Sequence, residues 1–243
     1  MTPRLYCPVG LDAAMALVLP DNAAHHAARV LRLGAGDAVT LFNGQGGEYR
    51  AELVEVRGGT VRARVLAHDP VERETPQHMT LVQALVSSDR MDYALQKAVE
   101  LGAAAIQPVT SERSIGRLDA ARAGKRKLHW QNIAIAACEQ CGRNRIPPVR
   151  DLVLFDAWLE DPLPAEHRWI LLPDGDIGVQ SMPKPHGKIA VMVGPEGGFT
   201  AAEASAARTR GWRGLRLGPR VLRTESAGAA VLAAANALWG DFA

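Results

Sequence analysis

Two short segments near the carboxyl end of the chain combine glycines with charged side chains in a pattern that suits ligand binding. The first, GPEGGFT at residues 194–200, follows the unbroken apolar run KIAVMV. The second, LGPRVLRTESAG, occupies residues 217–228. Glycines allow positive φ and let a ligand approach main-chain N–H groups, while glutamate and arginine bind polar groups. We therefore expect ligand chemistry at both segments.

The ligand of these segments is not one that the common glycine-rich motifs bind. GPEGG differs from G-x-G-x-x-G, no acidic residue follows at the distance a dinucleotide site needs, and the P-loop pattern is absent. Tight turns and helix caps would explain the glycines of a single loop equally well. A third loop, ILLPDGD at residues 170–176, favours a site, because ligands of open parallel sheets bind outside the carboxyl ends of strands.

Composition excludes several classes of protein. The 243 residues are nearly half apolar, which is typical of a globular α/β protein, and a net charge of +2 is too small to argue for nucleic acid by itself. Three cysteines form no disulfide framework, and the amino-terminal residues lack the apolar stretch of a signal peptide. No run is long enough to span a membrane. We therefore expect a cytoplasmic protein.

No metal site is expected. Cys138 and Cys141 form a C-x-x-C pair, but the chain has no second pair to complete four zinc ligands.

The elements that must position the loops fall into two predicted domains, residues 1–72 and 73–243. In the first, glycine pairs separate alternating segments and predict a β meander in a small barrel or sandwich, with one helix over 21–33. In the second, strands alternate with helices and predict a parallel sheet with helices on both faces. The strands of the first domain are expected at 38–42, 49–56 and 60–67. Those of the second are expected at 78–86, 103–112, 168–173, 188–194 and 214–218, and its helices at 88–102, 118–142, 202–211 and 226–240.

The two carboxyl-terminal motifs resemble those of the SPOUT methyltransferases, and specifically of the RsmE group, which methylates N3 of a uridine in small-subunit ribosomal RNA. Further stretches resemble the same group in the same order: HHAARVLRLGAGD, DRMDYALQKAVELGAAAIQPVTSERS, AIAACEQCGRNRIP and, more weakly, ILLPDG. Together they span almost the whole chain. One departure is Ser226, where the group usually has threonine, and this exchange keeps the hydroxyl.

The resemblance implies a fold class, a cofactor and partners. The fold would be α/β, with a SPOUT-type trefoil-knotted parallel sheet domain and a small amino-terminal β-rich, PUA-like barrel domain that helps to bind RNA. The cofactor would be S-adenosylmethionine, and the partners 16S rRNA in the small ribosomal subunit and a second copy of the chain in a homodimer. The residues assigned to the cofactor are Leu172, Pro173, Gly194, Glu196, Gly197, Gly198, Leu217, Gly218, Leu222, Arg223 and Thr224.

The proposed methyl transfer needs a group that removes or compensates the proton on uridine N3. Arg143 and Arg223 are candidates, because a guanidinium could stabilise the uracil anion through its oxygens, and Glu139 could be the base. Alternatives stay open: Arg143 could be a solvated residue after a helix, and Glu139 could pair with an arginine. Glu196 could bind cofactor hydroxyls or loop amides, or it could cap the helix that begins at Thr200.

Basic clusters are candidates for RNA phosphate contacts, although a solvated helix face would explain any one of them equally well. The predicted RNA-binding residues are Arg29, Arg32, Arg113, Arg117, Lys125, Arg126 and Lys127. Two other functions stay open, namely methylation of a different base or of a ribose 2′-hydroxyl by a SPOUT enzyme, and RNA binding without catalysis.

Overall fold

The computed structural model describes residues 2–115 and 120–242, and the chain divides into two compact units. Unit 1 contains residues 1–74 and 135–146, and unit 2 contains residues 75–134 and 147–243. The long helix α3 (Ala120–Cys141) contributes residues to both units. The end of this helix, together with the residues that follow it, therefore belongs with the amino-terminal part of the chain.

Unit 1 contains a five-stranded sheet in the order β1-β3-β4-β5-β2. The predicted meander is confirmed, since β3, β4 and β5 pair antiparallel in sequence order. Gly58 and Gly59 join β4 to β5 with φ values of +58° and +88°, as a tight two-residue hairpin requires. The short strands β1 and β2 were not expected. The strands are β1 (Arg4–Tyr6), β2 (Ala16–Val18), β3 (Ala38–Phe42), β4 (Glu48–Arg57) and β5 (Thr60–Asp69).

The predicted helix of unit 1 begins at the expected residue but changes its hydrogen-bond pattern. Helix α1 (Asp21–His25) continues directly into a π-helical turn, η1 (His26–Val30). Its N-cap is Pro20, and Asp21 lies in the first turn. The helix therefore ends earlier than residue 33, and Arg32 has a left-handed φ of +56°.

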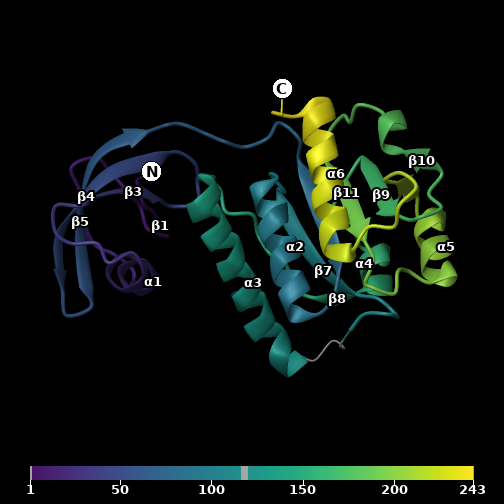
Figure 1. Cartoon of the computed structure of the whole chain (residues 1–243), viewed down its shortest axis with the longest axis horizontal. Coiled ribbons are helices and arrows are strands. Elements are labelled where there is room, and N and C mark those ends of the chain that lie inside the picture. Colours follow the sequence, from purple (N-terminus) through teal and green to yellow (C-terminus); the bar gives the residue numbers. More distant parts are fainter. Residues whose placement is uncertain (1, 116–119, 243) are drawn as a thin grey trace. The chain divides into compact units, whose positions relative to one another are not determined.

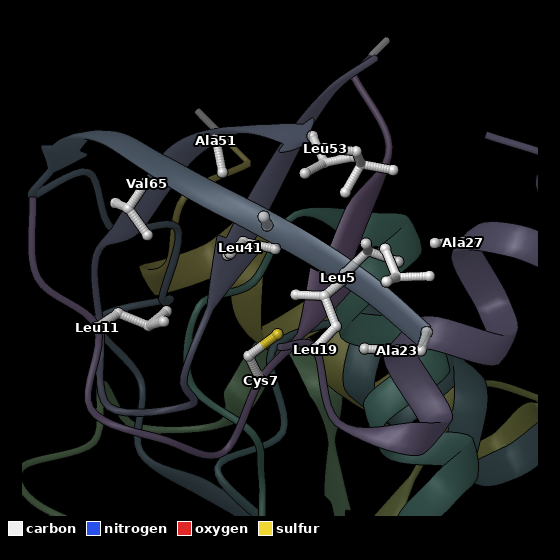
Figure 2. Close-up of a cluster of buried hydrophobic side chains, with 14 residues drawn as sticks. Leu5, Cys7, Leu11, Leu19, Ala23, Ala27, Leu41, Ala51, Leu53 and Val65 are labelled. Atoms are coloured by element: carbon white, nitrogen blue, oxygen red, sulfur yellow. The ribbon is translucent and has the colours of Figure 1, made fainter. Parts of the chain in front are cut away.

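The core of unit 1 consists of apolar side chains from the sheet and from this helix. Alternate residues of β4 and β5, such as Leu53 and Val65, are buried, as the two-residue period of a strand predicts. Figure 2 shows them gathered with Leu5, Leu41 and the small Ala23 of α1. Burial of this set gives unit 1 a hydrophobic core of its own.

Unit 2 contains a seven-stranded sheet in the order β10-β12-β9-β11-β6-β7-β8, and every pair in it is parallel. The predicted parallel sheet is therefore confirmed. All residues of the strands β6 and β11 are buried, which explains the continuous apolar sequence of β11 and the mostly apolar sequence of β6. The strands are β6 (Met79–Ala84), β7 (Ala105–Thr110), β8 (Val153–Leu154), β9 (His167–Leu171), β10 (Ile177–Gly178), β11 (Ile189–Val193) and β12 (Arg213–Arg216).

Helices cover both faces of this sheet, as predicted. Helices α2 and α6 lie side by side (Figure 1), and Gly228 of α6 packs over Leu81 and Gln83 of β6. The alternate side chains of β6, which include Val82, pack instead with α4 and α5. The short 3₁₀ helix η2 and helix α4 were not expected. These helices are α2 (Ser88–Glu100), α4 (Phe155–Glu160), η2 (Val179–Ser181), α5 (Ala201–Thr209) and α6 (Thr224–Trp239).

A short connection in unit 2 crosses a strand that comes later in the chain. Strand β12 lies between β9 and β10, so residues 172–176 must pass over it to join these two strands. Gly175 permits the crossing, because a Cβ at this position would lie 2.6 Å from the main-chain carbon of Leu215. The trefoil knot itself stays a prediction from the family resemblance.

Candidate functional site

The three glycine-containing loops meet at one edge of the parallel sheet. They follow β9, β11 and β12, which are neighbours in the order β12-β9-β11. Because the strands are parallel, their carboxyl ends lie at the same edge. The loops enclose a cavity of about 710 Å³. Three loops that are distant in sequence therefore line one cavity, and its use as a binding site stays a prediction.

All eleven residues predicted to bind the cofactor line this cavity. They are Leu172, Pro173, Gly194, Glu196, Gly197, Gly198, Leu217, Gly218, Leu222, Arg223 and Thr224. The sequence did not single out other lining residues, among them Asp174, Phe199, Arg208, Arg216 and Arg220. Arg216 is the last residue of β12, directly before the second motif, and Arg220 lies within that motif, so their position at the end of a strand was a usable signal. Arg208 comes from α5, and no local pattern indicates that it reaches the cavity.

The GPEGG loop is a tight turn whose shape depends on glycine. The N–H of Gly198 donates to the carbonyl of Pro195 at 2.9 Å, and Gly198 has a φ of +68°. The carbonyl of Gly197 accepts a hydrogen bond from Arg113 Nη1 at 2.9 Å, and a Cβ on Gly197 would lie 3.3 Å from the Arg113 side chain. A side chain would therefore crowd Arg113 at position 197, and at position 198 it would strain a backbone of positive φ.

Glu196 does not cap the helix after its loop, so that alternative is wrong. Thr200 is the N-cap of α5, and it forms a capping box with Glu203 through bonds of 2.8 and 3.2 Å. Glu196 instead accepts hydrogen bonds from the N–H of Ser87 at 3.3 Å and from Arg90 Nη1 at 3.0 Å. Ser87 is the N-cap residue of α2.

The hydroxyl of Thr224 connects the GPEGG loop to the segment 217–228. Thr224 Oγ1 donates to the carbonyl of Gly194 at 2.5 Å and accepts from Gln83 Nε2 at 3.1 Å. Gln83 is fully buried in β6, and the sequence signal for it was a lone amide within an apolar strand. This chain of bonds fixes the start of α6 against the end of β11.

The rim of the cavity carries exposed positive charge. Arg216, Arg220 and Arg223 are exposed, and none of them has an ion-pair partner among residues 2–115 and 120–242. Arg223 is also the N-cap residue of α6. Guanidinium groups in this state are available to bind anionic or carbonyl oxygens of a ligand.

The other two predicted catalytic residues belong to unit 1 and already have partners there. Arg143 is 4% exposed, so the alternative that it is solvated is wrong. Its Nε and Nη2 donate to the two carboxylate oxygens of Glu74 at 3.1 and 2.5 Å. Glu139 accepts from the N–H of Tyr6 at 2.9 Å and lies 3.3 Å from His26 Nδ1. Neither geometry tests a catalytic role, which stays a prediction for both residues.

The predicted RNA-binding residues have different environments. In unit 1, Arg29 and Arg32 are exposed. In unit 2, Lys125 is exposed, Arg126 is half-buried, and Lys127 donates to Asp151 at 2.8 Å. Two further residues complete the set: Arg113 donates to the GPEGG loop, as described above, and Arg117 lies outside the described residues.

The thiols of Cys7 and Cys138 are buried. Burial raises the pKa values of the Cys7 and Cys138 thiols to about 12, so both stay protonated at neutral pH. Within the described ranges, no three side chains of His, Cys, Asp or Glu are grouped as metal ligands. The helices in those ranges are too short or too polar to cross a membrane.

Comparison with known proteins agrees with this geometry. A family model described as an RNA methyltransferase domain matches residues 73–236, and one described as an RNA methyltransferase PUA domain matches residues 19–66. Ribosomal RNA small subunit methyltransferase E of Bacillus subtilis is 30% identical over 89% of this chain and 88% of its own length. The protein of the same name from Mycobacterium tuberculosis is 33% identical over 93% and 88%.

Two solved structures are similar along the full length of both chains. Ribosomal RNA small subunit methyltransferase E from Neisseria gonorrhoeae, bound to S-adenosylmethionine, is 42% identical with a TM-score of 0.93. A putative methyltransferase from Legionella pneumophila, in complex with the same cofactor, is 36% identical with a TM-score of 0.96. The coverage is 100% of each chain in both cases.

Proposed function

This chain belongs to the RNA methyltransferase family whose model matches residues 73–236, and we propose that it methylates N3 of a uridine in 16S ribosomal RNA with S-adenosylmethionine as donor. The observation that carries the proposal is the convergence of eleven residues, chosen from three separate segments, on one cavity. Relatives of the same length that bind this donor or carry the name of a ribosomal RNA methyltransferase support it.

The cavity suits S-adenosylmethionine in size and in chemistry. Its volume of about 710 Å³ falls within the range of small-molecule sites, about 300–1,000 Å³. Glycines at positions 194, 197, 198 and 218 bring main chain to its surface, and Leu217 and Leu222 supply apolar area for an adenine face. Glu196 adds a carboxylate for hydroxyl or amino groups.

The reaction makes different demands on the two substrates. The bound donor supplies a methyl group that is already activated by its sulfonium. Uridine N3 carries a proton, so it becomes a nucleophile only when that proton leaves. Arg223 lines the cavity and has no partner in the described part of the chain, so it is suited to stabilise the uracil anion through its carbonyl oxygens. Arg143 and Glu139 remain predicted contributors without an assigned step.

The rim arginines extend the site toward the rest of the RNA. Arg216 and Arg220 come from the same segment as Arg223, and all three are exposed. We assign Arg216 and Arg220 to phosphates next to the target nucleotide, since such contacts position a strand without reading its sequence. We assign RNA contacts also to the PUA-like domain, residues 1–72, through Arg29 and Arg32.

The proposal includes a homodimer that acts in the cytoplasm without a metal. Exposed apolar side chains near the end of the chain, Leu238 and Phe242, are suited to a contact with a second copy. The family resemblance implies that each site is completed by the partner chain. Methyl transfer from a sulfonium needs no metal, and ribosomal RNA as substrate supports a cytoplasmic location.

The decisive experiment is a methyl-transfer assay on small ribosomal subunits that lack the modification. Labelled donor is supplied, the RNA is digested, and the modified nucleoside is identified and mapped by mass spectrometry. The expected product is one 3-methyluridine at a single position. A methylated ribose or a different methylated base would instead indicate the reaction of another kind of SPOUT methyltransferase. If calorimetry detects no binding of S-adenosylmethionine, the result would favour an RNA-binding protein without catalysis.

A further inference from the structure

Arg90, near the beginning of α2, lies between two carboxylates that come from two different cavity segments. Its Nη1 donates to Glu196 Oε1 at 3.0 Å, and its Nε lies 4.0 Å from Glu225 Oε1. Glu196 belongs to the GPEGG loop, and Glu225 belongs to the segment 217–228, in the first turn of α6. One guanidinium therefore connects two of the three segments that form the cavity.

This group has two negative charges and one positive charge, and all three side chains are partly buried. The side chains of Glu196 and Glu225 are 20% and 19% exposed, and that of Arg90 is 34% exposed. The Oε2 atoms of both glutamates are buried and have no hydrogen-bond partner in the described part of the chain. Two carboxylates thus share one cation, and without it they would repel each other at low solvent exposure.

Arg90 acts from a helix, whereas Glu196 lies on a loop and Glu225 lies in the first turn of α6. Helix α2 packs against α6, and its N-cap residue Ser87 donates its N–H to the same oxygen of Glu196. Arg90 itself does not line the cavity, but Glu196 does. The beginning of α2 is therefore a rigid anchor for a loop that contacts the ligand.

We propose that Arg90 is a positioning residue that sets the spacing between the GPEGG loop and the beginning of α6, and thereby the affinity for the methyl donor. This inference rests on the proposed function of the same cavity. The neutral hydrogen bond from Thr224 to Gly194 joins the same two segments, but among residues 2–115 and 120–242 only Arg90 forms ion pairs with Glu196 and Glu225.

The test compares donor binding by isothermal calorimetry in wild type, Arg90→Gln, Arg90→Lys and Arg90→Gln/Glu225→Gln. We expect the Kd for S-adenosylmethionine to rise about tenfold in Arg90→Gln and less in Arg90→Lys, which keeps the charge but not the planar fork. The double variant should recover much of the loss, because the repulsion between the glutamates is gone. The KM for RNA should stay within about twofold in every variant.

The matched control is Arg210→Gln. Arg210 has a similar side-chain exposure of 36% and pairs with Glu160 in unit 2, but it does not line the cavity or contact its loops. Its variant should bind the donor like wild type. Circular dichroism shows whether each variant folds. If Arg90→Gln does not fold, donor binding is compared between Arg90→Lys and wild type instead.

Three outcomes would overturn the inference. Equal donor affinity in wild type and in Arg90→Gln would remove the positioning role while leaving the proposed function intact. An equal loss in Arg210→Gln, or no recovery in the double variant, would reduce Arg90 to a general contribution to stability. Wild type that binds no S-adenosylmethionine would overturn the proposed function together with this role.

Discussion

The cavity of unit 2 and the ion-pair cluster of unit 1, formed by Arg4, Glu48, Arg73, Glu74 and Arg143, use arginine in opposite ways. In the cluster each arginine has a partner: Arg4 and Arg73 pair with Glu48, and Arg143 pairs with Glu74. At the cavity rim, the exposed Arg216, Arg220 and Arg223 have no ion-pair partner in the described part of the chain.

This difference shows that the partner of an arginine, and not its sequence motif, indicates its role. A buried arginine that is bound to a carboxylate cannot leave without exposing an uncompensated charge, so it holds structure together. An exposed arginine without an ion-pair partner can bind a ligand anion without breaking an existing ion pair. The sequence predicted two catalytic arginines, and they differ in this respect. Arg143 is buried and paired with a carboxylate, whereas Arg223 is exposed and has no ion-pair partner in the described part of the chain.

The largest effect is expected from the cluster. Arg143→Met should lower the free energy of unfolding by about 3 kcal/mol, because Glu74 loses its partner at low solvent exposure. Urea denaturation measures this change. The control Arg62→Met breaks an exposed pair with Glu55 and should cost less than about 1 kcal/mol. Similar losses in both variants would contradict the distinction between buried and exposed pairs. Methyl transfer that persists in folded Arg143→Met would count against a catalytic role for Arg143.

The next effect concerns the cavity, where space and not charge is decisive. Gly197→Leu should weaken donor binding about a hundredfold, because a Cβ at this position already lies 3.3 Å from the Arg113 side chain, so the larger side chain must displace the loop, and overpacking costs about 1–3 kcal/mol. Calorimetry with S-adenosylmethionine measures the loss. Gly178→Ala is the control, since a Cβ at Gly178 meets no atom within 4 Å and the residue does not line the cavity. Unchanged binding in Gly197→Leu would reject the GPEGG loop as donor site.

A smaller effect distinguishes the rim arginines from the cluster through salt dependence. Arg220→Gln should weaken RNA binding and reduce the slope of log K against log salt concentration by about 0.7, the value for one phosphate contact of a single strand. Donor affinity should not change. Arg213→Gln provides the control, because Arg213 is exposed at the opposite end of β12 and does not line the cavity. An equal change of slope in both variants would indicate nonspecific attraction.

The smallest effect is the response of the cluster to acid. Burial opposes ionisation of Glu48, but hydrogen bonds from Arg73 and Arg4 prevail and lower its pKa. Its contribution to stability is therefore complete above the unfolded pKa of roughly 4.3 and is lost as the pH falls through the lower folded value. Glu48→Gln should be less stable at pH 7, and its unfolding free energy should fall less steeply below about pH 5. Glu55→Gln, at an exposed pair, should keep the wild-type profile; an identical profile for Glu48→Gln would exclude this role.

Local patterns were sufficient to predict the main elements and the donor loops. Strand 38–42 was predicted with its observed bounds, and the paired glycines at 58–59 marked the hairpin because a two-residue turn needs positive φ. Glycine-rich loops after apolar strands indicated the cavity, since parallel strands end at a common edge. Strands of two or three residues, such as β1 and β8, carry too few side chains for a periodic signal.

The sequence by itself thus determined two features: the alternation of strands and helices, and the cavity lined by loops at three strand ends. Both depend on backbone geometry, which neighbouring residues specify. Only the tertiary structure decided which charges are satisfied, because the partners are far apart in the chain: Arg143 meets Glu74 across 69 residues, and Arg90 meets Glu196 across 106. No local period encodes such pairs, and they separate the arginines that hold the fold from those that remain open to a ligand.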